Sequence, residues 1–223
     1  MMQQHKPAPR SGFSLLEVVF SVALLGTIMM LTGLVSTTGQ NAYQGTSAAS
    51  ALNAKVKLTI DRIAMEMQLA SVGTFVPTLD GVVTDTSVIS FQQLVDIQDG
   101  VPVYGGPTPD EVMAIQFLIG AGEVADGADN NGNGLVDEMR VVLVRDVGTA
   151  LQSRVTLCND VSSLLEGEVL GGGDENGNGL TDEGGFVLER NGEVLTIRLS
   201  LEGVSADGVV LVRTGETAIR LRN

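Results

Sequence analysis

An apolar segment near the N-terminus places the strongest constraint on this 223-residue chain. It runs from Phe13 to Val35, and about 20 apolar residues in a helix are enough to cross the hydrocarbon core of a bilayer. Its only charged side chain is Glu17. A carboxylate at membrane depth costs on the order of 2.5–3.5 kcal/mol on insertion scales, so it normally has a cationic partner. The sequence therefore predicts a membrane-spanning helix in which Glu17 has a specific electrostatic role.

A short basic leader precedes this segment. It has no apolar region of its own, ends at Gly12, and contains the basic residues Lys6 and Arg10. Cleavage after Gly12 would create a free amine at Phe13, one helical turn from Glu17. Because basic residues precede the span and none follows it closely, we expect the N-terminus in the cytoplasm and the rest of the chain exported.

The residues GFSLLE at 12–17 resemble the class III leader of type IV pilins and type II secretion pseudopilins, a basic leader followed by GF(S/T)LxE and an apolar helix. The resemblance implies cleavage between Gly12 and Phe13 by the prepilin peptidase, N-methylation of Phe13, and filament assembly through the helix. Glu17 would then neutralise the Phe13 amine of a neighbouring subunit. The implied partners are other pilin or pseudopilin subunits, the prepilin peptidase and the inner-membrane assembly platform. The alternatives are an ordinary secretory signal, which would end in a small-residue cleavage site, and a plain membrane anchor, which has no use for Glu17.

The helical pattern continues beyond the apolar segment. Apolar residues recur every three or four positions at Leu52, Val56, Ile60, Ile63, Met67 and Ala70. We therefore expect one helix from about Phe13 to Ser71, whose amphipathic second half needs a sheet to cover it. Many major pilins kink this helix with a proline, but none occurs between Pro9 and Pro77, so the chain is more similar to minor pilins. The stalk sequence and the ending RLRN resemble the minor pilin W and minor pseudopilin J group.

After Gly73 the sequence changes to short strand-forming stretches separated by Gly, Pro, Asn and Asp. The expected strands are Ser87 to Gln93, Val112 to Ile119, Met139 to Arg145, Arg154 to Cys158, Phe186 to Arg190, Glu193 to Leu201, Val209 to Arg213 and Thr217 to Leu221. Asn191-Gly192 suits a two-residue type I′ hairpin turn. Leu195, Ile197, Leu199 and Leu201 should share one face. Leu94 to Pro109 is interpreted as a surface loop.

Two ten-residue loops nearly repeat each other: DNNGNGLVDE at 129–138 and DENGNGLTDE at 174–183. Oxygen-bearing side chains at positions one, three, five and nine, with Gly at six and a carbonyl at seven, match the first part of a calcium-binding EF-hand loop. The expected Ca²⁺ ligands of the first loop are Asp129, Asn131, Asn133, the Leu135 carbonyl, Asp137 and Glu138. Those of the second loop are Asp174, Asn176, Asn178, the Leu180 carbonyl, Asp182 and Glu183.

The loops depart from a full EF-hand at position twelve, where Arg140 and Gly185 replace the bidentate glutamate. Strands are expected to follow them in place of a helix, so they resemble the DxNxNG calcium loops of many secreted bacterial proteins. The alternative is an Asx-rich turn without metal. We favour calcium because two acidic loops carry an electrostatic repulsion that a cation relieves.

Charge and composition exclude several functions. The net charge is −14, or −16 without Lys6 and Arg10, whereas direct nucleic-acid binding needs clustered Lys and Arg. The only histidine, His5, lies in the leader, which removes His-based catalysis and the usual zinc sites from the exported part. Cys158 is the single cysteine, and we interpret it as a buried strand residue, with an intermolecular bridge or reactive thiol as the alternative.

These features together predict an α+β, pilin-like protein that is not an enzyme. Its expected parts are a cleaved leader (1–12), a transmembrane helix (13–35), an amphipathic continuation (36–72) and an extracytoplasmic β-rich domain (73–223) with two calcium loops. The expected function is a structural subunit, a minor pilin or minor pseudopilin, of a type IV pilus or type II secretion filament, stored in the inner membrane with its C-terminal domain outside the cytoplasm. The alternative is a membrane-anchored, calcium-dependent binding or adhesion module that uses the helix as a tether.

Overall fold

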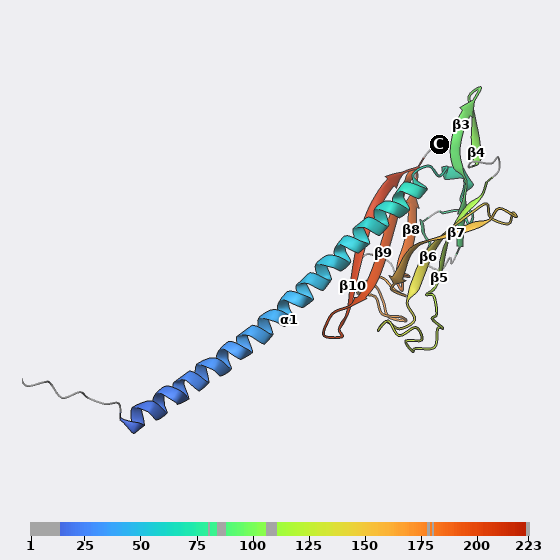
Figure 1. Cartoon of the computed structure of the whole chain (residues 1–223). Helices are drawn as coiled ribbons and strands as arrows, with labels where there is room; N and C mark the ends of the chain where they lie inside the picture. Colours follow the sequence, from blue (N-terminus) through green and yellow to red (C-terminus); the bar gives the residue numbers. More distant parts are fainter. Residues whose placement is uncertain are drawn as a thin grey trace, which may run out of the picture. The chain divides into compact units, whose positions relative to one another are not determined.

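A computed structural model describes residues 14–79, 81–83, 88–105, 111–177, 179 and 181–221. The chain divides into two compact units, Met1–Gln44 and Gly45–Asn223. The described residues form one long helix, an eight-stranded antiparallel sheet and a separate two-stranded hairpin. The expected α+β class is therefore confirmed (Figure 1). The expected leader, including the cleavage position Gly12 and Phe13, lies outside the described residues.

The helix, α1, spans Leu15–Met67. It contains a segment long and apolar enough to cross a membrane, and none of that segment is buried within the protein. The helix ends before the expected Ser71 because the following backbone turns to pair with a strand. The Leu69 carbonyl accepts from the Leu94 amide at 2.9 Å, and the Ser71 amide donates to the Gln92 carbonyl at 3.0 Å. A short 3-10 turn, η1, follows at Val72–Thr74.

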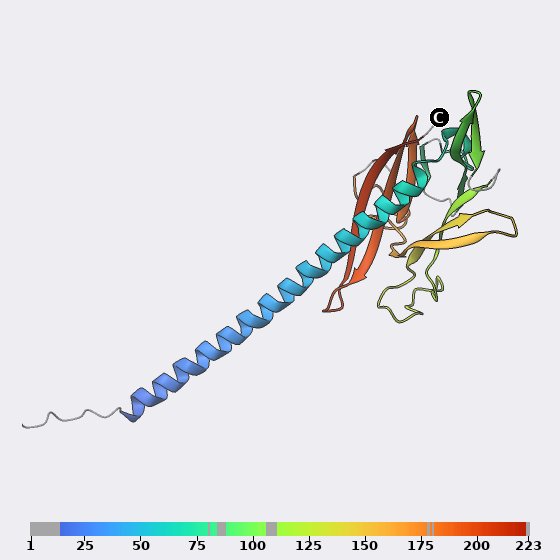
Figure 2. The same cartoon turned by 45° about the horizontal axis from the view of Figure 1, so that its top comes forward.

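All strand pairs are antiparallel, and the main sheet has the order β1-β8-β9-β7-β6-β5-β2, with β10 on the other side of β9. The strands of this sheet are β1 (Gly81–Val83), β2 (Val88–Phe91), β5 (Met113–Ile119), β6 (Met139–Arg145), β7 (Ser153–Val161), β8 (Phe186–Asn191), β9 (Val194–Val204) and β10 (Val210–Arg220). β7 meets β9 through the single pair Val161 and Leu201. The sheet thus consists of two groups of strands, which Figure 2 shows diverging from each other.

Two expectations for the last strands need correction. The two strands expected at 209–213 and 217–221 are one continuous strand, β10. The β8–β9 turn is displaced by one residue, because Asn191 pairs with Val194 and the loop is Gly192-Glu193. Only Gly192 of these two has a positive φ, +63°, as in a type II′ turn, whereas type I′ requires positive φ at both central residues.

The expected surface loop at Leu94 to Pro109 is wrong over its first part. There β3 (Gln93–Gln98) and β4 (Val101–Gly105) form a hairpin. Its turn residues Asp99 and Gly100 both have positive φ, +52° and +81°, as a type I′ turn requires. Pro102 lies within β4, which is tolerated because a two-stranded sheet has only edge strands. Residues 106–110 lie outside the described part of the chain.

The core of the second unit lies between the distal half of α1 and the sheet. The six apolar residues that recur along this part of the chain are all buried: Leu52, Val56, Ile60, Ile63, Met67 and Ala70. The four β9 residues expected to share a face are buried as well: Leu195, Ile197, Leu199 and Leu201. Each fully buried Leu or Ile contributes about 1.5–3 kcal/mol. In both views the end of α1 lies along β9 and β10, and a Cβ at Gly215 would be 2.5 Å from Val56 Cγ1. The expected amphipathic helix on a sheet is confirmed.

The same part of α1 also exposes apolar side chains on the face away from the core. Leu58 is 71% exposed and Met65 is 72% exposed. They are seven residues apart, so they lie on one side of the helix. The exposed residues Asp61 and Arg62 lie between them on the same side, so this side carries both apolar and charged residues. This outer face, Leu58 and Met65, is therefore available for another protein surface.

Candidate functional site

Glu17 lies in the first turn of α1 and is exposed. The Ser14 hydroxyl accepts from the Glu17 amide at 3.2 Å, so Ser14 caps the helix. A carboxylate in the first turn also interacts favourably with the helix dipole. Glu17 makes no ion pair with any described residue, and its expected partner, the Phe13 amine, belongs to the part of the chain that is not described.

The hydroxyl groups of the apolar segment are satisfied by the helix itself. Ser21, Thr27 and Thr32 each donate to the carbonyl four residues earlier, at 2.8–3.0 Å, and Thr37 and Thr38 do the same just beyond the segment, at 3.2 and 2.9 Å. Hydrocarbon offers no hydrogen-bond partner, so this arrangement removes the cost of placing these groups in a bilayer. Glu17 is then the one side chain of the segment that needs an external partner for its charge.

The first loop is organised around Asp129. One of its carboxylate oxygens accepts from the amides of Gly132 and Asn133, and the other accepts from Gly134 at 2.8 Å. These hydrogen bonds, the one from Gly134 foremost, lower the pKa of Asp129 below its usual value. Asp129 therefore keeps a negative charge at the mouth of the loop.

Glu138 lies inside the first loop. It is 3% exposed, and its Oε1 accepts from the side-chain amides of Asn131 at 2.7 Å and Asn133 at 2.8 Å. Its Oε2 is buried and has no hydrogen-bond partner among the described residues. Three residues predicted as ligands are thus brought together: the amides of Asn131 and Asn133 both contact the Glu138 carboxylate.

The remaining predicted residues of the first loop have other surroundings. The Asp137 carboxylate accepts from the amides of Asp126 and Gly127 at 3.1 and 2.9 Å, which closes the loop at its base. Leu135 is buried. Within the described ranges, no three Asp, Glu, His or Cys side chains converge as a preformed metal site. The structure therefore brings together one carboxylate and two amides, and it directs Asp129 and Asp137 towards backbone amides.

The second loop repeats this organisation where it is described. Gly179 donates to Asp174 at 2.8 Å, and Gly171 donates to Asp182 at 2.9 Å. Glu183 is completely buried, as Glu138 nearly is. The expected ligands Asn178 and Leu180 fall in gaps of the described chain. Asn176 is exposed.

The repeat is longer than the ten residues first recognised. Residues 120–138 and 165–183 align without gaps and are identical at 12 of 19 positions. Their backbones agree as well: Asp137 and Asp182 both have φ of +53°, and the glycine pairs 122/167, 132/177 and 134/179 all have φ between +75° and +92°. The two segments are therefore two copies of one folded module.

The longer module includes a glutamate that the sequence analysis missed. Glu123 is buried and accepts from the amides of Asn130 and Asn131, while Glu168 accepts from Asn176 and Asp182. Glu123 thus holds the start of the first loop, and Glu168 connects positions three and nine of the second loop. The signal was present in the sequence, because Glu123 and Glu168 have the same spacing of 45 residues as the loops.

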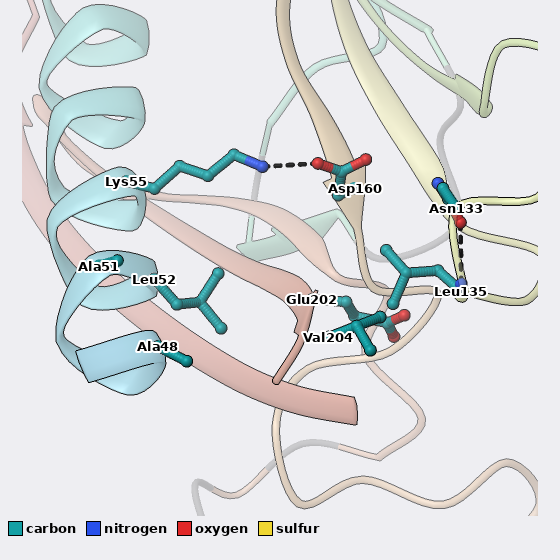
Figure 3. Close-up of a pocket in the computed structure, with 10 residues that line it drawn as sticks. Ala48, Ala51, Leu52, Lys55, Asn133, Leu135, Asp160, Glu202 and Val204 are labelled. Atoms are coloured by element: carbon teal, nitrogen blue, oxygen red, sulfur yellow. Dashed lines mark hydrogen bonds and ion pairs between the residues drawn. The ribbon is translucent and has the colours of Figure 1, made fainter. Parts of the chain in front are cut away.

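In the second unit, a cavity of about 410 Å³ separates the first loop from the end of α1 that packs on the sheet (Figure 3). Asn133 and Leu135 line one side, and Ala48, Ala51, Leu52 and Lys55 of α1 line the other. Asp160 and Glu202 point into it, and Lys55 forms an ion pair with Asp160 at 2.6 Å. Burial raises the pKa of Glu202, and the nearby charges of Glu138 and Asp160 raise it further. The lining of this cavity is therefore rich in negative charge.

Cys158 lies in β7 and is 7% exposed, which confirms its interpretation as a buried strand residue. Burial raises the pKa of its thiol to about 12, so the thiolate does not form at neutral pH.

No family model, curated protein or solved structure matches this chain.

Proposed function

We propose that the protein is a structural subunit of a type IV pilus or type II secretion filament, processed by the prepilin peptidase and assembled through α1. The observation that carries the proposal is an apolar, membrane-length helix with one carboxylate, Glu17, at its start. The GFSLLE resemblance supplies the partner for this carboxylate, the Phe13 amine of a neighbouring subunit. In the membrane the helix stores the subunit, with its N-terminus in the cytoplasm and its β-rich domain outside.

The outer face of α1 supports assembly over simple anchoring. A tether needs only the membrane-spanning segment, but apolar exposure continues beyond it at Leu58 and Met65. Burial of two such side chains between helices contributes about 1.5–3 kcal/mol each. Helices that bundle in a filament core would bury this face, whereas a monomeric tether would leave it in water.

Glu17 would also set the axial register of assembly. A subunit in the correct position pairs its carboxylate with a neighbour's amine. In a wrong position the carboxylate would stay buried and unpaired, which costs several kcal/mol. The same interaction thus provides affinity and selects against misplaced subunits.

The double variant Leu58→Lys/Met65→Lys tests the proposal against the tether. It should leave the protein in the membrane and folded, and should abolish its recovery in sheared filaments, because two ammonium groups cannot enter the bundle. The matched control is Leu151→Lys/Val101→Lys, which changes two equally apolar residues, 69% and 63% exposed, outside the helix. Normal filament recovery of the Leu58/Met65 variant, or equal loss in the control, would contradict assembly through this face.

Glu17→Gln provides the second test. The amide keeps the shape of the side chain but cannot neutralise an amine. We expect normal membrane insertion and loss of incorporation. If the protein were instead a membrane-anchored binding module, Glu17→Gln would leave its cation-dependent binding unchanged, and the protein would not depend on filaments for its function.

A further inference from the structure

The Glu138 carboxylate is buried, and the structure pairs it with no cationic side chain among the described residues. Burial of an ionised carboxylate is costly unless a counter-charge is nearby. Its two partners, the amides of Asn131 and Asn133, are neutral, and its Oε2 has no partner among the described residues. This is an unsatisfied acceptor at the centre of a loop, not at its surface.

No cationic side chain in the described part of the chain pairs with Glu138. Among the described residues, no Lys or Arg lies within ion-pair distance of Glu138. Lys55, a basic residue that lines the cavity, forms an ion pair with Asp160. Arg140, two residues along the chain, forms no ion pair with Glu138, and its buried Nε has no hydrogen-bond partner among the described residues. The described residues therefore supply no counter-charge for Glu138.

The atoms around Glu138 are the ligands that hard divalent cations prefer. Two amides face Glu138, and the same loop carries the ionised carboxylate of Asp129, whose oxygens accept from the backbone amides of Gly132, Asn133 and Gly134. The oxygen of each amide accepts one backbone hydrogen bond, Asn131 Oδ1 from the Asn133 amide at 3.0 Å and Asn133 Oδ1 from the Leu135 amide at 2.8 Å, and it keeps a second lone pair for a cation. The resulting donors are all oxygens and come from a loop of irregular shape. This set suits Ca²⁺, whereas Mg²⁺ demands near-ideal octahedral geometry.

We propose that the first loop binds one Ca²⁺ ion, held by the Glu138 carboxylate with side-chain oxygens of Asp129, Asn131 and Asn133. The ion takes the place of the two NH₂ groups at Glu138 and neutralises the negative charge of this carboxylate. This proposal stands apart from the filament function, since a tether or a filament subunit could carry the site equally well.

The position of the loop adds a consequence for the stalk helix. Leu135 is buried, and with Asn133 it lines the cavity opposite Ala48, Leu52 and Lys55 of α1. A Cβ at Gly134 would be 3.1 Å from Val204 Cγ2, so the loop also packs against the end of β9. Bound Ca²⁺ should therefore order both the loop and the segment 48–55 of α1.

Hydrogen exchange measured by mass spectrometry on the full chain in detergent micelles tests the proposal. The protein is stripped with a chelator and compared with and without CaCl₂ or MgCl₂. At a Ca²⁺ concentration 100 times the Kd, opening of the site should become roughly 100-fold less frequent, and exchange in 120–138 should slow by the same factor. A smaller slowing is expected in 48–55.

Glu138→Gln should abolish the response of 120–138, because it removes the charge that binds the ion. Glu183→Gln, the equivalent change in the second module, is the matched control and should leave that response intact. If Glu138→Gln does not fold, Asp129→Asn, at an exposed position, carries the same test. Exchange in 120–138 that is unaffected by Ca²⁺, a response retained in these first-loop variants, or an equal response to Mg²⁺ would overturn the proposal.

Discussion

At Gly215 the strand β10 closely approaches α1, and Gly215→Ala tests whether this contact stabilises the second unit. The added Cβ would lie 2.5 Å from Val56 Cγ1 and 3.0 Å from Ile60 Cδ1. Carbon atoms in favourable contact are about 3.5–4.0 Å apart, so one partner has to move by about 1 Å. Ile60 presents the end of a flexible chain, but Val56 is β-branched and nearly fixed in a helix.

The expected magnitude follows from two opposing terms. Overpacking of a core costs about 1–3 kcal/mol. Replacement of glycine at an unstrained position gains about 0.4–1 kcal/mol through the unfolded state. Gly215→Ala should therefore lower the free energy of unfolding by about 1–2 kcal/mol. For a unit of this size each kcal/mol corresponds to about 2–4 °C in Tm.

Gly203→Ala is the matched control, since it lies on the adjacent strand β9 and faces the same helix. Its Cβ would be 3.5 and 3.7 Å from the two methyl groups of Leu52, an ordinary contact. Circular dichroism of the full chain in detergent should show a lower Tm for Gly215→Ala and an unchanged or higher Tm for Gly203→Ala. A Gly215→Ala protein as stable as the control would refute the packing described here.

Three further predictions concern single side chains. Ile63 is completely buried, so Ile63→Ala should lower the free energy of unfolding by about 2–5 kcal/mol in chemical denaturation, and a loss below 1 kcal/mol would contradict its place in the core. The pKa of Glu202 is raised above its ordinary 4.5, so its favourable contribution is present below pH 4.5 and is lost as pH rises through the raised value. Glu202→Gln should therefore stabilise the protein at pH 7 more than at pH 4, and an equal effect at both would refute the assigned cause. The Cys158 thiol should react with a maleimide far more slowly in the folded protein than in denaturant, and equal rates would show that it is accessible.

The helix and most of the sheet could be predicted because their signals are periodic. The buried stripe of α1 and the alternation along β9 depend only on which side chains must leave water. Two expectations are wrong because a residue that usually interrupts strands lies inside one. Gly215 lies between the two expected strands at 209–213 and 217–221, but it belongs to β10 and allows the close approach of the helix. Pro102 lies in the expected loop, but it belongs to β4 of a hairpin whose turn is Asp99-Gly100.

The loops show a different limit of sequence reasoning. Spacing identified Asn131, Asn133 and Glu138, and the structure brings them together. Spacing alone could not show that Asp137 closes the base of the loop or that Glu123 holds its start, because both depend on hydrogen bonds to backbone amides. The structural surroundings of Gly12, Phe13, Asn178 and Leu180 belong to the part of the chain that is not described, so their roles remain predictions from the sequence.

The most direct test of the central claim is the intact mass of the membrane-extracted protein, expressed with and without a prepilin peptidase. The account predicts a peptidase-dependent loss of residues 1–12 and the addition of one methyl group to the new N-terminus at Phe13. An unprocessed chain, or a cut beyond the apolar segment, would contradict a filament subunit and favour a membrane-anchored binding module.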